Sequence, residues 1–161
     1  RTTTYLGAPH HWIFETSLAA IGGAAVYLNG RNRAQLPGPG SAPHPRVTAW
    51  SNDGGETFAN VSNSTVPTLD CDSNGVQQGM TSSAARPGSV ALLAPMGPPP
   101  HPAARFNPVN NTGRRHLVLH RSRDGARTWP PELAETVNEG YGGYSSLAIV
   151  ADAAAGAAAG A

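Results

Sequence analysis

The sequence is poor in three features that would each point to a particular class of protein. Cys71 is the only cysteine in 161 residues, which excludes an internal disulfide and argues against a cysteine-based zinc site. Charged residues make up 13% of the chain and the formal net charge is +1, so nothing favours nucleic acid or an acidic membrane surface as a partner. No apolar run approaches the roughly 20 residues that span a bilayer, and we expect no transmembrane segment.

Turn-forming residues are abundant where charge is scarce. The 19 glycines and 15 prolines suit short strands joined by many turns better than they suit amphipathic helices. We therefore expect an all-β protein. Residues 1–150 should form its folded part, whereas residues 151–161 are Ala/Gly low complexity and should carry no function.

Apolar or alternating segments predict β-strands along the chain. Residues 13–29 are typical of a β-hairpin, because two apolar segments flank Gly22-Gly23. Further strands are expected at residues 46–50, 89–94, 115–121 and 144–150.

Two polar segments share the pattern Ser-x-Asp-x-x-x-Thr-aromatic. They are SNDGGETF at residues 51–58 and SRDGARTW at residues 122–129, and each follows an expected strand, so they form an internal repeat. The aspartate can accept hydrogen bonds from backbone N–H groups, and glycine supplies a positive φ. Ala126 stands in the second copy where the first has Gly55, which predicts a strained or altered second turn.

This repeat resembles the Asp-box of sialidases and several other β-propellers. Further motifs around it make the resemblance to sialidases more specific. In order, they are Phe14-Glu15-Thr16, Leu28-Asn29-Gly30-Arg31-Asn32, Val76-Gln77-Gln78-Gly79, Arg114 and Gly143-Tyr144-Ser145-Ser146-Leu147. Their order and spacing are similar to the second half of an exo-α-sialidase. The resemblance implies a partial six-bladed β-propeller, about its last three blades, with structural Asp-box turns over residues 1–150.

The same resemblance assigns roles to five residues. It makes Tyr144 the nucleophile and Glu15 its base. Arg31 and Arg114 would bind the carboxylate of sialic acid, and Gln78 would line the pocket. The chemistry suits these residue types, because a planar guanidinium meets both oxygens of a carboxylate. That substrate carboxylate would repel an anionic nucleophile, whereas a neutral phenol avoids the clash, and sialidases are a known exception in using tyrosine.

The implied reaction is hydrolysis of terminal α-linked sialic acid from glycoproteins, glycolipids or oligosaccharides. It proceeds with retention through a sialyl–tyrosine intermediate and needs no metal or cofactor. The family's first arginine and its acid/base aspartate have no counterpart here, which implies a fragment. Two other functions stay open: a trans-sialidase, and a non-catalytic Asp-box propeller that serves as a binding module. Arg115 and Tyr141 remain alternatives for Arg114 and Tyr144.

The remaining polar motifs point to no further site. The histidines have no metal-ligand spacing and are expected on the surface; they are His10, His11, His44, His101, His116 and His120. Three Asn-x-Ser/Thr triplets, at Asn60, Asn63 and Asn110, would permit glycosylation in a secretory route. The compartment stays open, with the secretory pathway, the lysosome and the cell exterior as candidates.

Overall fold

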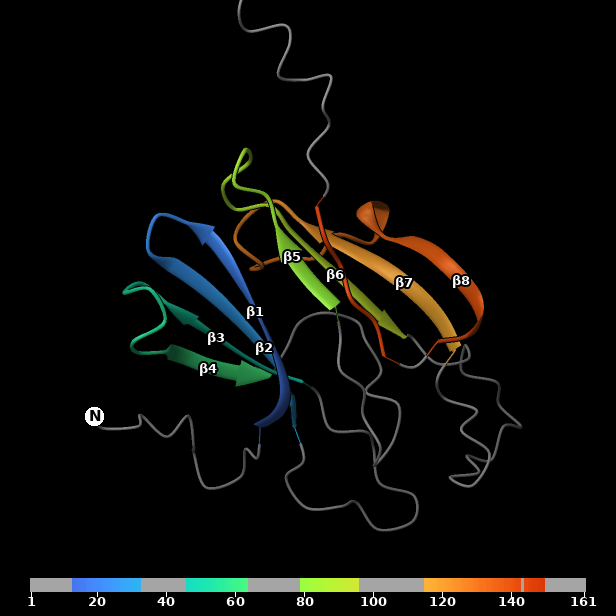
Figure 1. The fold of residues 1–161 in the computed structure, drawn as a ribbon, viewed down its shortest axis with the longest axis horizontal. Helices are drawn as coiled ribbons and strands as arrows, with labels where there is room; N and C mark the ends of the chain where they lie inside the picture. Colours follow the sequence, from blue (N-terminus) through green and yellow to red (C-terminus); the bar gives the residue numbers. More distant parts are fainter. Residues whose placement is uncertain (1–12, 33–45, 64–78, 96–114, 143, 150–161) are drawn as a thin grey trace, which may run out of the picture.

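The protein is all-β, as a computed structural model shows (Figure 1). The structure describes residues 13–32, 46–63, 79–95, 115–142 and 144–149. These residues form two four-stranded antiparallel sheets, and the one helical element among them is a short 3-10 turn, η3, at Pro131–Leu133. The prediction of an all-β protein is therefore confirmed.

Each sheet is a meander, because strands that are neighbours in the sequence are also neighbours in the sheet. The first sheet has the order β1-β2-β3-β4, with strands at Ile13–Gly22, Ala25–Asn32, Val47–Ser51 and Ala59–Asn63. The second has the order β5-β6-β7-β8, with strands at Gly79–Ser82, Val90–Pro95, Arg115–Ser122 and Glu135–Tyr141. The sheets lie side by side, and β1 of one contacts β5 of the other (Figure 1).

Most of the predicted strands are confirmed to within a few residues. The expected hairpin corresponds to β1 and β2, and the expected strands at 46–50, 89–94 and 115–121 correspond to β3, β6 and β7. The prediction of a strand at 144–150 is wrong for its described part, because residues 144–149 have no strand pairing. Side-chain hydrogen bonds hold this segment instead, as when Ser145 Oγ donates to the backbone oxygen of Leu93 at 2.7 Å.

The hydrophobic core lies between the two sheets. Its buried members are Ala19, Tyr27, Val90, Leu92, Ala126 and Trp129. The ring of Tyr27 lies 5.2 Å from that of Trp50 and 6.3 Å from that of Trp129, both tilted. The indole N–H of Trp50 donates to the backbone oxygen of Gly125 at 2.9 Å, so a single hydrogen bond ties the first sheet to the turn that follows β7.

The two Ser-x-Asp turns repeat one hydrogen-bond network, as the sequence predicted. In the first turn, Ser51 Oγ donates to Asp53 at 2.6 Å, and the Thr57 hydroxyl and backbone N–H donate to the same carboxylate at 2.5 and 2.9 Å. These bonds hold the pKa of Asp53 well below its ordinary value, and the bond from Ser51 lowers it most.

The second turn copies this network with different residues. Ser122 Oγ and Thr128 Oγ1 donate to the Asp124 carboxylate at 2.7 and 2.6 Å. Desolvation raises the pKa of Asp124, but hydrogen bonds from Thr128, Ser122 and Arg127 outweigh it and bring that pKa to about 2. Ala126 has a φ of +64°, the left-handed backbone anticipated at this position, and its side chain is buried in the core.

His120 does not lie on the surface, contrary to the prediction. It is 3% exposed, and on β7 it pairs with Leu92 of the core. On β7 the buried residues are Val118, His120 and Ser122, whereas Leu117 and Leu119 are only partly buried. Desolvation disfavours the charged imidazole and lowers the pKa of His120 to about 4, from 6.5.

This burial predicts a loss of stability at mildly acidic pH. As the pH falls below 6.5, the unfolded state takes up a proton on His120 while the folded state does not, so the free energy of unfolding decreases until about pH 4 and then levels off. The total loss should be about 3 kcal/mol, from 1.36 kcal/mol per pKa unit. Urea titrations between pH 4 and 7 measure it.

A His120→Gln variant is the control for this effect. It removes the titrating group, so its unfolding free energy should be nearly flat from pH 6.5 to pH 4. The hydrogen-bonded aspartates of the two turns stabilise the fold at higher pH and lose this contribution mainly as the pH falls below about 3.8, their ordinary pKa, which is largely outside this window. Equal pH slopes in the two proteins would contradict the burial argument.

Candidate functional site

The start of β1 and the end of β2 bring together a carboxylate and a guanidinium. Antiparallel pairing places Phe14 opposite Arg31, so Glu15 lies next to Arg31 on the neighbouring strand. Arg31 Nη1 lies 3.2 Å from Glu15 Oε2. The Arg31 side chain is only 12% exposed and that of Glu15 27%, so this ion pair is partly withdrawn from solvent.

Glu15 lies in an irregular part of β1. The register of β1 against β2 shifts between Phe14 and Ser17, and Glu15 has a φ of +44°. A positive φ is uncommon outside glycine, and such residues, like β-bulges, concentrate at functional sites, where they redirect a side chain. The backbone irregularity thus coincides with the residue that carries the carboxylate.

Gly30 allows the irregular part of β1 to lie close against β2. A Cβ atom on Gly30 would stand 2.3 Å from Ile13 Cγ2 and 2.8 Å from Thr16 Cγ2. Both distances are far below van der Waals contact, and both atoms belong to β-branched side chains that are stiff at χ1. The absence of a side chain at Gly30 is therefore what lets Glu15 come close to Arg31.

Tyr144 approaches the same carboxylate from the far end of the chain. Its hydroxyl donates to Glu15 Oε1 at 3.3 Å, across a sequence separation of 129 residues. The side chain is 62% exposed, which is high for a tyrosine held in a polar contact. Glu15 thus bridges a phenol through one oxygen and a guanidinium through the other.

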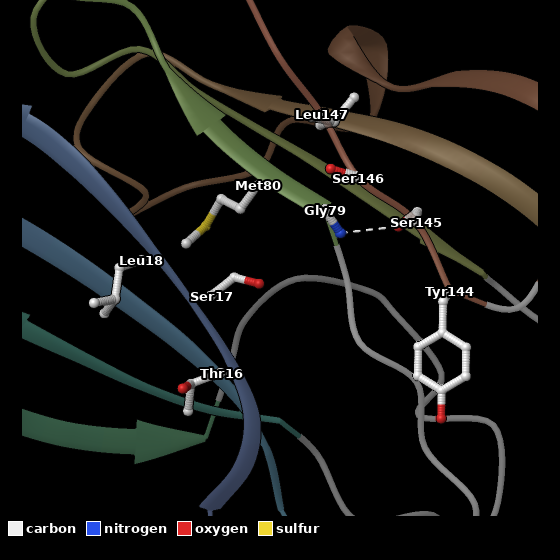
Figure 2. Close-up of a pocket in the computed structure, with 9 residues that line it drawn as sticks. All are labelled: Thr16, Ser17, Leu18, Gly79, Met80, Tyr144, Ser145, Ser146 and Leu147. Atoms are coloured by element: carbon white, nitrogen blue, oxygen red, sulfur yellow. Dashed lines mark hydrogen bonds between the residues drawn. The ribbon is translucent and has the colours of Figure 1, made fainter.

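An open groove of about 580 Å³ runs beside this cluster, between β1 and β5 (Figure 2). Figure 2 shows the Tyr144 ring at one end of it, with the hydroxyl directed away from Met80 and Leu18. The groove is lined by Thr16, Ser17, Leu18, Gly79, Met80, Tyr144, Ser145, Ser146 and Leu147.

Three of the five residues predicted for the site come together, namely Glu15, Arg31 and Tyr144. Arg114 and Gln78 lie outside the described residues, although the next residue after each begins a strand, β7 and β5 respectively. The side chains of the two alternatives, Arg115 and Tyr141, are likewise not described; their backbones pair with each other between β7 and β8.

Sequence reasoning gave no role to Ser145, which the structure places at the site. The backbone N–H of Gly79 donates to Ser145 Oγ at 2.8 Å, so two of the motifs noted in the sequence meet directly (Figure 2). Their adjacency in space has no local signal in the sequence, because 66 residues separate them.

The arrangement suits nucleophilic chemistry. A carboxylate within hydrogen-bond reach of a phenol can take its proton and so activate the oxygen as a nucleophile. A nearby guanidinium can bind a planar anion through several N–H donors. Within the described segments, no group of three His, Cys, Asp or Glu side chains could hold a metal ion.

Comparisons with known proteins add no family. No protein-family model matches the chain, and no curated protein matches it either. No helix in the part of the chain that the structure describes is long and apolar enough to cross a membrane.

Proposed function

We propose that this chain supplies part of the catalytic site of a retaining exo-α-sialidase, an enzyme that removes terminal α-linked sialic acid. The observation that supports this most strongly is the hydrogen bond from Tyr144 Oη to Glu15 Oε1 across 129 residues. The motifs that resemble sialidases assigned nucleophile and base to these two side chains. The substrates would be sialylated glycoproteins, glycolipids or oligosaccharides.

In the proposed reaction, Glu15 takes the phenolic proton while Tyr144 Oη attacks the anomeric carbon. The bond to the leaving group breaks as the bond to Tyr144 forms, and the leaving oxygen takes a proton from an acid outside this chain. Water then attacks the anomeric carbon of the sialyl–tyrosine and gives a proton to the conjugate base of that acid. The bond to Tyr144 Oη breaks at the same time, and Glu15 returns its proton to the phenolate, which restores the phenol. Two displacements give net retention.

Arg31 would hold the carboxylate of sialic acid, with Arg114 as its partner and Gln78 at the pocket wall. A guanidinium carries five N–H donors, so Arg31 can face Glu15 and a substrate carboxylate together. Its low exposure strengthens such an ion pair, because nearby water would weaken it.

We further propose that the two sheets are adjacent blades of a six-bladed β-propeller, of which residues 1–150 would form about the last three. Two four-stranded meanders that meet through β1 and β5 suit radially arranged blades. The two Ser-x-Asp turns would be its Asp-boxes. The family's remaining arginine and its acid/base aspartate would come from other blades.

The rival function, a non-catalytic propeller that only binds, gives no reason for a phenol to meet a carboxylate and a guanidinium. It predicts that Glu15 and Tyr144 lie far apart, whereas they are within hydrogen-bond reach. A trans-sialidase would use the same three side chains, and only an added acceptor distinguishes it from a hydrolase.

The direct test is turnover of a fluorogenic α-sialoside by the full-length protein that contains this chain. We expect NMR to show that the α-anomer of sialic acid is released first. A matching uncharged galactoside should not be turned over. Added lactose would divert the product to sialyl-lactose in a trans-sialidase. No turnover, or first release of the β-anomer, would contradict the proposal.

A further inference from the structure

The side chain of Ser145 attaches the segment that carries Tyr144 to the second sheet. Residues 144–149 form no strand, but Ser145 Oγ donates to the backbone oxygen of Leu93 at 2.7 Å and accepts from the backbone N–H of Gly79 at 2.8 Å (Figure 2). The hydroxyl thus uses its donor and an acceptor site on two neighbouring strands, β5 and β6.

Gly79 permits a very close approach at this point. A Cβ atom on Gly79 would stand 2.7 Å from both Cα and the carbonyl carbon of Ser146, and 2.9 Å from the backbone nitrogen of Leu147. All three are backbone atoms, which cannot move aside as the end of a flexible side chain can. The segment therefore lies directly on the backbone of β5, and any larger residue would displace it.

The phenol of Tyr144 gains little support from packing. The side chain is 62% exposed, so close packing does not hold it, and its 3.3 Å hydrogen bond to Glu15 is long for an O–H donor. Ser145, the adjacent residue, is by contrast held through its side-chain hydroxyl by two hydrogen bonds of normal length. The position of the phenol therefore depends on that attachment.

We infer that Ser145 is a positioning residue, whose hydroxyl, together with the glycine at 79, holds the nucleophile Tyr144 against Glu15. The inference rests on the proposed function. It also makes the two halves of the catalytic pair structurally alike: Gly30 lets the backbone of Glu15 approach β2, and Gly79 lets the segment of Tyr144 approach β5.

The test compares three variants of the full-length protein. Ser145→Ala should lower kcat about 10- to 100-fold, because a nucleophile misplaced by about 1 Å reacts roughly 100-fold more slowly. KM should change less than about threefold, since Arg31 stays in place. Ser145→Thr keeps a hydroxyl and should restore most of kcat. Thr136→Ala is the matched control, because this exposed hydroxyl lies on β8 at the edge of the second sheet and does not line the groove, and its kcat should stay within about twofold.

A second readout does not depend on catalysis. Hydrogen exchange at the Gly79 amide should be faster in Ser145→Ala than in the unsubstituted protein, and unchanged in Ser145→Thr and Thr136→Ala. Should Ser145→Ala fail to fold, Ser145→Cys retains a weak donor and acceptor, and its kcat should be reduced about 10-fold.

Two failures can be told apart. If the unsubstituted protein turns over sialosides but Ser145→Ala, or Ser145→Cys in its place, has the same kcat, only the positioning role is overturned. A loss confined to KM, or no recovery in Ser145→Thr, would overturn it too. If the unsubstituted protein has no sialidase activity at all, the proposed function fails and this inference fails with it.

Discussion

Replacing Tyr144 with phenylalanine is expected to lower kcat for an α-sialoside at least about 1,000-fold, the scale on which loss of an enzymatic nucleophile is felt. The change removes a single oxygen atom, the one that lies 3.3 Å from Glu15 Oε1. Without it, the proposed covalent intermediate cannot form. KM should change little, because the ring stays and Arg31 is untouched. Steady-state kinetics with a fluorogenic sialoside measure both constants.

Folding should be unaffected by this change. The Tyr144 side chain is 62% exposed, so its substitution should shift the unfolding free energy by less than about 0.5 kcal/mol. Tyr141→Phe is the matched control, since Tyr141 is the other tyrosine nearby in the sequence, and its turnover should stay within about twofold. If Tyr144→Phe remained within tenfold of the unsubstituted protein, or if Tyr141→Phe were the inactive one, the nucleophile assignment would be wrong.

The second large effect is expected from Glu15→Gln, which should lower kcat about 100- to 10,000-fold, the usual contribution of general acid–base catalysis. Glutamine has nearly the same shape and keeps an oxygen for Arg31 Nη1, but it cannot accept the proton of the phenol. Steady-state kinetics of the two proteins with a fluorogenic sialoside measure the effect.

The matched control for this change lies on the far strand of the second sheet. Glu135 also pairs with an arginine, because Arg121 Nη2 lies 2.7 Å from its carboxylate. Both side chains are exposed, that of Arg121 by 43% and that of Glu135 by 62%. Glu135→Gln breaks a surface ion pair of little energetic value and should leave kcat within about twofold. Equal losses in the two variants would mean that charge, and not proton transfer, explains the effect of Glu15.

Strands with an apolar pattern could be predicted from the sequence, and polar ones could not. Residues 90–94 are apolar throughout, and Leu92, Leu93 and Ala94 are indeed buried. β8, with the sequence ETVNEGY, has no apolar alternation, because it lies at the edge of its sheet and most of it is exposed. Backbone pairing with β7 forms this strand, and such pairing does not require a hydrophobic pattern that the sequence would show.

Long-range contacts set the limit for predicting the candidate site. The motifs identified Glu15, Arg31 and Tyr144, and the structure brings these three together. The sequence offered no sign that Gly79 would support Ser145, because a glycine in a short motif is equally typical of a turn. Close backbone approaches of this kind depend on the packing of distant segments, which periodicity does not report.

The central claim, that the phenol of Tyr144 becomes covalently bound to the substrate, is tested most directly by trapping the intermediate. A sialosyl fluoride with a second fluorine beside the anomeric carbon destabilises the cation-like transition states and slows breakdown of the adduct. Incubated with the full-length protein and followed by peptide mass spectrometry, it should add one fluorosialyl group to the peptide that contains Tyr144. An adduct on another residue, or rapid turnover with no adduct at any time, would contradict the account.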